Sequence, residues 1–165
     1  MKTILFFIGL FVTILPGYGQ TAEEFYQKGN DKFKLQDYTG AIADYSSCIE
    51  INPTNINCYI KRGDAKDSLE KYAGAIVDYT KAIELDLKNS DYYFKRGNAK
   101  SGLRYFDEAI IDYTKAIEIN PEKADYYYAR GNAKSNLGVN VCVDFGKAAK
   151  LGHAEADKFV KRYCD

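Results

Sequence analysis

Apolar residues recur at helical spacing along most of the chain. In the segment 109–117 they fall three or four positions apart, which places them on one face of an amphipathic helix. The same pattern occurs twice more toward the N-terminus at a constant interval, the earliest time with one cysteine in place of an alanine. The pattern predicts a series of similar helices. Its positions are Ala109, Ile110, Tyr113, Ala116 and Ile117, then Ala75, Ile76, Tyr79, Ala82 and Ile83, and first Ala41, Ile42, Tyr45, Cys48 and Ile49.

Glycine recurs at the same interval, at Gly29, Gly63, Gly97 and Gly131, and the segment DYTKAIE begins both at Asp78 and at Asp112. A fixed period of about 34 residues is the signature of a solenoid, and each unit predicts two helices with the glycine inside the first. Glycine costs about 1 kcal/mol there relative to alanine. We therefore expect the two helices of a unit to cross at the glycine, with no room for a Cβ.

The unit resembles the tetratricopeptide repeat (TPR) family, whose repeats of about 34 residues carry two aromatics, a glycine, two alanines and a proline at set positions. The resemblance implies an all-α, right-handed superhelix of about four helix-turn-helix repeats. A short helix at 154–163 is expected to cap the array, because a terminal repeat must shield the last apolar face. The third unit matches with Tyr93, Gly97, Ala109, Tyr113, Ala116 and Pro121, and the expected repeats are 22–55, 56–89, 90–123 and a degenerate 124–151.

Residues 1–19 have the anatomy of a secretory signal peptide: Lys2, an apolar run of twelve residues, then a proline and two glycines. A twelve-residue helix spans about 18 Å, less than the roughly 30 Å of a bilayer core. We therefore expect cleavage after Gly19, no membrane insertion of the mature chain, and one TPR domain over 20–165. Such a domain is periplasmic or secreted, where disulfides form.

Charge and composition argue against several functions. The chain has 23 basic and 23 acidic residues, without the basic surplus of a nucleic-acid-binding protein. His153 is the single histidine, and the sequence contains no glycine-rich phosphate loop and no metal-ligand spacing. We therefore expect no enzymatic activity, no cofactor, no metal site and no nucleic-acid partner.

Basic residues replace apolar ones at two positions of each first helix, and each second helix carries an aspartate at nearly the same period. Unpaired charges on a packing face are costly. We interpret the two sets as a ladder of ion pairs inside the scaffold; the alternative is a basic stripe that binds an anionic ligand. The bases are Lys28, Lys32, Arg62, Lys66, Arg96, Lys100, Arg130 and Lys134, and the acids are Asp44, Asp78, Asp112 and Asp144.

The four cysteines lie symmetrically about two predicted turns. In an antiparallel helix pair, residues equidistant from the turn lie opposite each other, and a disulfide needs Cα atoms within about 7 Å. This predicts two disulfides, with four buried free thiols as the alternative; zinc is not expected, because the sequence has no paired Cys-x-x-Cys motif. The predicted pairs are Cys48–Cys58 about the turn at Pro53 and Cys142–Cys164 about the turn at His153.

In the TPR family the first helices line a concave surface, and the resemblance places two rows of side chains on it. Aromatic rings give contact area at low entropic cost and amides can bind a peptide backbone, so the rows suit an extended peptide or a partner helix. The alternative is that the rings fill the space between adjacent first helices. The apolar row is Tyr26, Ile60, Phe94 and Tyr128, and the polar row is Asn30, Asp64, Asn98 and Asn132.

A well-known TPR site clamps a C-terminal carboxylate with a lysine and an asparagine of the first unit. Here Asn30 is present, but Tyr26 stands in place of the lysine. Asp91 also puts an acid in the third unit where a cation is wanted. A clamp of this kind is therefore not expected.

These observations together predict a non-enzymatic protein–protein interaction scaffold that binds a peptide or protein segment on its concave surface. The alternative is a structural or self-assembling accessory subunit of an envelope complex. An exposed apolar patch near Phe25 and Phe33, at the N-terminal end of the array, would favour this alternative.

Overall fold

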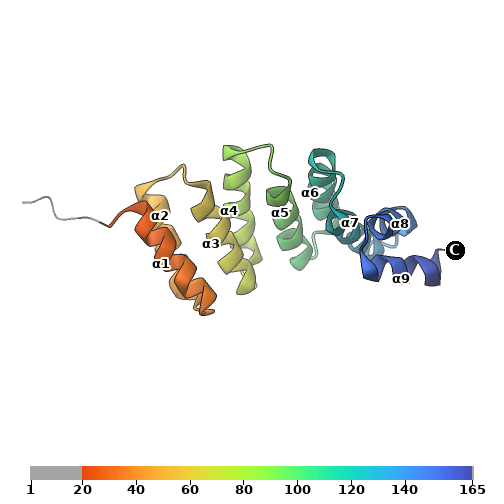
Figure 1. Cartoon of the computed structure of the whole chain (residues 1–165), viewed down its shortest axis with the longest axis horizontal. Helices are drawn as coiled ribbons and strands as arrows, with labels where there is room; N and C mark the ends of the chain where they lie inside the picture. Colours follow the sequence, from red (N-terminus) through yellow and green to blue (C-terminus); the bar gives the residue numbers. More distant parts are fainter. Residues whose placement is uncertain (1–19, 165) are drawn as a thin grey trace, which may run out of the picture.

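The computed structural model describes residues 20–164, which form nine helices and no strand. The helices follow one another along the longest axis from α1 to α9 (Figure 1). The predicted signal peptide, 1–19, lies outside the described residues. Within 20–164 no helix has the length and apolar character needed to cross a membrane. The helices are α1 (Ala22–Lys34), α2 (Tyr38–Ile51), α3 (Ile56–Ser68), α4 (Tyr72–Leu85), α5 (Ser90–Gly102), α6 (Phe106–Ile119), α7 (Ala124–Asn136), α8 (Cys142–Lys150) and α9 (Ala154–Tyr163).

Each repeat is a pair of helices joined by a short turn, and each pair packs against the next. The first helices also contact one another, α1 with α3 and α5 with α7. We call the surface made by α1, α3, α5 and α7 the first-helix face, and the surface made by α2, α4, α6 and α8 the second-helix face. The predicted all-α solenoid of helix-turn-helix repeats is confirmed.

The turn inside each repeat contains one residue with left-handed backbone geometry. In the first three repeats this residue is Gln36, Glu70 or Arg104, with φ of 62°, 55° and 63°; in the fourth it is Gly138, with φ of 70°. An L-residue in this conformation costs about 1–2 kcal/mol, which glycine avoids. This feature was not predicted, because glutamine, glutamate and arginine give no turn signal.

Each repeat glycine lies against an aromatic ring of the second helix of its own repeat. A Cβ placed on Gly97 would lie 2.7 Å from Cε1 of Tyr113, closer than side-chain atoms approach each other. The expectation that the helices cross without room for a Cβ is thus confirmed, and the group that fills the space is an aromatic side chain. The four contacts are Gly29 with Tyr45, Gly63 with Tyr79, Gly97 with Tyr113 and Gly131 with Phe145.

The helix α9 covers the end of the array, as the sequence predicts. The preceding helix α8 has nine residues, whereas α2, α4 and α6 have fourteen each. Phe159 of α9 places its ring centroid 4.5 Å from that of Phe145, which is 2% exposed. His153 caps α9, because its Nδ1 accepts a hydrogen bond from the backbone N–H of Ala156 at 3.2 Å. The last apolar face is therefore shielded by an element outside the repeats.

Two disulfides join elements that are consecutive in the chain. The Cα atoms are 6.3 Å apart in the pair that links α2 to α3, and 5.6 Å apart in the pair that links the start of α8 to the residue after α9. These are the two pairs that the symmetry about the turns predicts, Cys48–Cys58 and Cys142–Cys164.

Candidate interaction surface

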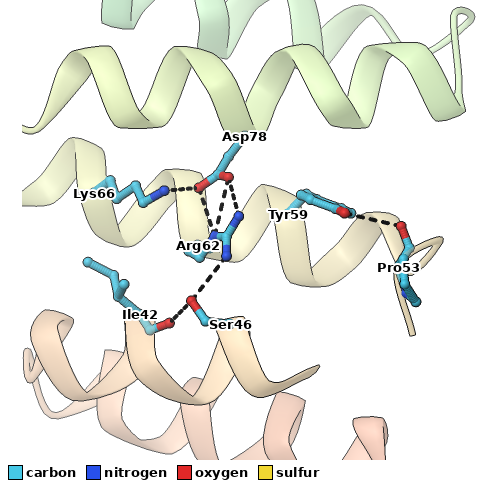
Figure 2. Close-up of polar contacts among 7 residues, drawn as sticks. All are labelled: Ile42, Ser46, Pro53, Tyr59, Arg62, Lys66 and Asp78. Carbon is cyan, nitrogen blue, oxygen red and sulfur yellow. Dashed lines mark hydrogen bonds and ion pairs between the residues drawn. The ribbon is translucent and has the colours of Figure 1, made fainter. Parts of the chain in front are cut away.

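Ion pairs run through the interior of the array. Figure 2 shows the unit at the second repeat, where Arg62 Nη2 lies 2.7 Å from Oδ1 of Asp78 and Lys66 Nζ lies 2.7 Å from Oδ2 of the same carboxylate. The side chain of Asp78 is 1% exposed. The predicted ladder is confirmed, so these bases do not form a surface stripe for an anion. The equivalent groups are Arg96 and Lys100 with Asp112, and Arg130 and Lys134 with Asp144.

The arginines also link each repeat to the one before it. Nη1 of Arg62 donates to Oγ of Ser46 in α2 at 3.0 Å (Figure 2). The guanidinium also lies over the ring of Tyr59, 5.7 Å from its centroid. One side chain therefore contacts three helices and uses most of its donors. The contact with the preceding repeat was not predicted from the sequence, and it recurs from Arg96 to Thr80 and from Arg130 to Thr114.

The first and last units of the ladder differ in their surroundings. In the first repeat Asp44 pairs with Lys32 at 2.7 Å, while Lys28 lies over the ring of Phe25 instead. In the fourth repeat, burial would raise the pKa of Asp144, but hydrogen bonds from Arg130 and Lys134 hold it below its ordinary value.

The polar row is held by tyrosine hydroxyls. Tyr113 donates to Oδ1 of Asn98 at 2.9 Å, and the first two repeats contain the same bond. Burial raises the pKa of Tyr113 to about 12 and also raises those of the two equivalent tyrosines. In these three repeats an oxygen of the polar-row residue thus accepts a hydrogen bond within its own repeat. The donor nitrogens of Asn30 and Asn98 remain available to a ligand. The other two bonds are Tyr45 to Asn30 at 2.9 Å and Tyr79 to Asp64 at 3.0 Å.

The apolar row is half-buried, and its rings pack on aromatic side chains of neighbouring helices. The ring centroid of Tyr26 lies 6.1 Å from that of Tyr45, and the ring of Phe94 lies between two tyrosines at 5.8 Å and 4.9 Å. Tyr128 stacks on His153 at 3.9 Å. Each of these side chains therefore contributes to packing while keeping part of its surface open, and Ile60 does the same.

Two hollows open among the first helices. A central hollow of about 250 Å³ spans α1, α3 and α5, with Phe33, Asp64, Asp67, Lys95 and Asn98 among its walls. Lys95 Nζ pairs with Oδ1 of Asp64 at 2.8 Å, and burial raises the pKa of Asp67. The other hollow, the cap groove, has a volume of about 330 Å³ and lies between α7 and α9. Its walls include Tyr128, Asn132, Ser135, Phe145, Phe159, Arg162 and Tyr163.

The two hollows bring together four of the eight predicted binding residues, Asp64 with Asn98 and Tyr128 with Asn132. The other four, Tyr26, Asn30, Ile60 and Phe94, line neither hollow. The α9 residues of the cap groove were missed, because the sequence pattern predicts that helix only as a cap. The alternation of aromatic and basic residues near its end, in the segment KFVKRY, was the available signal.

The second-helix face has two larger cavities, of about 430 and 410 Å³, each flanked by an exposed apolar residue. Val77 is 66% exposed and Ile111 67% exposed. The charged groups that line these cavities already pair with one another, as Lys81 does with Glu84 at 2.9 Å. The cavities therefore offer few free polar groups to orient a ligand, and we place the candidate surface on the first-helix face despite its smaller hollows.

Other candidate sites are not supported among residues 20–164. No group of histidine, cysteine, aspartate or glutamate there is arranged to hold a metal ion. Phe25 and Phe33 are half-buried, the first under Lys28 and the second against the ring of Tyr38, with 5.2 Å between centroids. The exposed apolar patch that would favour self-assembly is thus not formed at these residues.

Comparison with known proteins places the repeats in a family. The family described as TPR repeat matches residues 29–66 and 106–138, and the family described as Tetratricopeptide repeat matches residues 56–89. The chain belongs to the TPR family. No curated protein matches its sequence significantly.

Solved structures of other TPR proteins share the fold. MamA is similar at a TM-score of 0.77 and 24% identity, over 82% of this chain and 81% of MamA. The TPR domain of OM64 from Arabidopsis has a TM-score of 0.67 and 28% identity, over 70% of this chain and 96% of that domain. The first TPR domain of Spaghetti (RPAP3), solved with the HSP90 peptide SRMEEVD, has a TM-score of 0.69 and 28% identity, over 72% and 94%.

Proposed function

We propose that this TPR protein is a non-enzymatic scaffold that binds an extended peptide or partner segment along its first-helix face. The observation that carries the proposal is that the donor nitrogens of Asn30 and Asn98 are unpaired among the described residues, while the oxygens of both side chains accept hydrogen bonds from tyrosine hydroxyls. A peptide backbone presents carbonyl oxygens along its length, and amide donors can bind them. The half-buried apolar row beside these donors supplies contact area.

Two further observations support the proposal. The TPR fold is that of a protein–protein interaction scaffold, and the RPAP3 domain, which is similar to this chain, was solved with a bound peptide. The HSP90 type of peptide is not the expected ligand here, because Tyr26 stands where a carboxylate clamp needs a lysine. We also propose that the protein acts after export, since the two disulfides suit an oxidising compartment.

The test uses asparagine-to-aspartate changes, which remove the donors and keep Oδ1, the atom that accepts the tyrosine hydroxyl at Asn30 and Asn98. Asp64 demonstrates that an aspartate is accommodated in the polar row. The bait carries Asn30→Asp, Asn98→Asp and Asn132→Asp, and partners are captured from the native extracellular or periplasmic extract. We expect the wild-type bait to retain a protein that this variant loses.

A matched control adds the same charge elsewhere. Its three asparagines, Asn52, Asn120 and Asn140, each accept a hydrogen bond through Oδ1, here from a backbone N–H, and they lie in connecting turns. The control bait should retain the partner. A second bait with Tyr26→Ala, Phe94→Ala and Tyr128→Ala tests the apolar row, once circular dichroism has verified its fold. Equal retention by all baits would contradict binding at the first-helix face.

A further inference from the structure

The cap groove lies at the C-terminal end of the first-helix face, and one of its walls belongs to α9, which is not part of a repeat. Tyr128 of α7 forms one side, and Phe159 and Tyr163 of α9 form the other. Tyr163 is 62% exposed, so its ring is open to a ligand. A volume of about 330 Å³ is near the lower end of the range for ligand sites. The groove therefore fits one large side chain with a short stretch of backbone.

In the fourth repeat the polar-row residue, Asn132, lacks the hydrogen bond that a tyrosine hydroxyl donates in the other repeats. In the first three repeats that residue accepts a hydrogen bond from a tyrosine hydroxyl. Phe145 takes the place of the tyrosine against Gly131 and has no hydroxyl to donate. The carboxamide of Asn132 consequently has no partner among residues 20–164, and both its oxygen and its nitrogen are available in the groove.

Among residues 20–164, one positive charge at the rim of the groove has no carboxylate partner. Lys158 and Glu155 neutralise each other, with Nζ and Oε1 at 2.8 Å. Arg162 lies over the ring of Tyr163, 5.3 Å from its centroid, and pairs with no carboxylate of the described residues. Within the part of the chain that the structure describes, the groove thus combines aromatic walls, an amide without a hydrogen-bond partner and a guanidinium without a carboxylate partner. The ligand that complements these groups is apolar and anionic.

We propose that the cap groove binds a peptide segment in which an aromatic side chain lies next to a carboxylate. The ring packs between Tyr128 and Phe159, the carboxylate pairs with Arg162, and Asn132 binds the adjoining backbone. Aromatic rings favour offset and edge-on contacts with one another, which a groove with walls on two sides provides. This inference rests on the proposed function, because the groove is one end of the first-helix face.

A fragment titration tests the proposal. N-acetyl-phenylalanine carries both groups, and N-acetyl-phenylalaninamide lacks the charge. Each is added at millimolar concentrations to the oxidised, isotope-labelled protein, and the NMR signals of the Asn132 side-chain amide and the Arg162 Nε–H are followed. We expect the acid to shift both signals and to bind about threefold or more tightly than the amide, as an exposed ion pair allows. N-acetyl-aspartyl-phenylalaninamide then shows whether a side-chain carboxylate serves as well as a terminal one.

Two variants decide whether the charge acts in the groove. Arg162→Gln should abolish the preference for the acid and leave the affinity for the amide unchanged. Arg104→Gln is the matched control, because Arg104 is also exposed over an aromatic ring, 5.8 Å from Phe106, but lies outside the groove. Equal affinity for acid and amide, a preference that survives Arg162→Gln, or no shift at Asn132 would overturn the proposal. If the polar-row bait still loses its partner in that event, the proposed function stands and the contact lies elsewhere on the first-helix face.

Discussion

Whether replacing a repeat glycine by alanine stabilises or destabilises the protein depends on what surrounds the added Cβ. Replacing glycine by alanine inside a helix stabilises it by about 1 kcal/mol, other things being equal. At Gly97 the added Cβ would lie 2.7 Å from Cε1 of Tyr113, a ring that is 2% exposed. Overpacking of this kind costs about 1–3 kcal/mol. Moving the ring would also stretch the bond from its hydroxyl to Asn98, worth about 1 kcal/mol.

The sum of these terms is a loss of about 2 kcal/mol for Gly97→Ala. Gly146→Ala is the matched control, because Gly146 is also helical and a Cβ there meets nothing within 4 Å. It should stabilise the protein by about 0.5–1 kcal/mol. Guanidinium unfolding followed by circular dichroism measures both, and the midpoints should move in opposite directions from the wild type.

Gly131→Ala refines the comparison, because its ring belongs to Phe145 and has no hydroxyl bond to lose. Its cost should be smaller than that of Gly97→Ala by about 1 kcal/mol, and Phe145→Leu should offset part of it. If Gly97→Ala stabilised the protein as much as Gly146→Ala, the steric explanation of the repeated glycine would be wrong.

Four other changes test separate features. Arg96→Met leaves Asp112, which is 3% exposed, paired with Lys100 alone, and should lower the unfolding free energy by about 3 kcal/mol. The double variant with Asp112→Leu should recover most of this loss. A small loss in the single variant would contradict a structural role for the ion pairs. Glu70→Gly removes an L-residue at φ of 55° and should stabilise the protein by about 0.5–1 kcal/mol in the same assay; a destabilised variant would contradict this. Burial raises the pKa of Tyr113 to about 12, so the folded state favours the neutral hydroxyl. The resulting stability is present below pH ~10 and is lost as the pH rises toward 12. Tyr113→Phe should reduce this loss of stability at alkaline pH, which guanidinium unfolding at several pH values measures. Cys142→Ser with Cys164→Ser should lower stability by about 2–4 kcal/mol and increase hydrogen exchange in α9, whereas unchanged exchange would mean that packing alone holds the cap.

The repeats, the helix-turn-helix units and the disulfide pairs were predictable because each depends on periodicity or on symmetry about a turn. A helix pair places Cys142 opposite Cys164 whatever the rest of the fold does. Contacts between repeats were not predictable in this way. The bond from Arg62 to Ser46 depends on how α3 sits against the helix before it, and no pattern within one unit reports that arrangement.

The candidate site was predictable only in part, for a related reason. The polar row could be placed on the first helices from the resemblance to the TPR family, but its hydrogen bonds to Tyr45 and the equivalent tyrosines could not be predicted. Asn132 lacks this bond because Phe145 stands where the other repeats have a tyrosine. The equivalence is hard to see in the sequence, because Phe145 follows its repeat glycine by 14 residues, whereas the tyrosines follow theirs by 16. The position of Arg162 at the groove could not be predicted, because the sequence does not show which side of α9 faces α7.

The arginine contacts also bear on how stiff the array is. Each guanidinium fastens its own helix pair to the preceding one through bonds of about 3 Å on both sides, for example 2.7 Å to Asp112 and 3.1 Å to Thr80 for Arg96. Flexing the solenoid at such a joint would break a part-buried hydrogen bond, so these bonds resist a change in the spacing between successive repeats. If the first-helix face binds a peptide, as we propose, a stiff array favours ligands that match the spacing of its repeats, because little free energy is then needed to bend the protein. The first repeat has Lys28 in place of the arginine, and no helix pair precedes it within the described residues, so it lacks a joint of this kind.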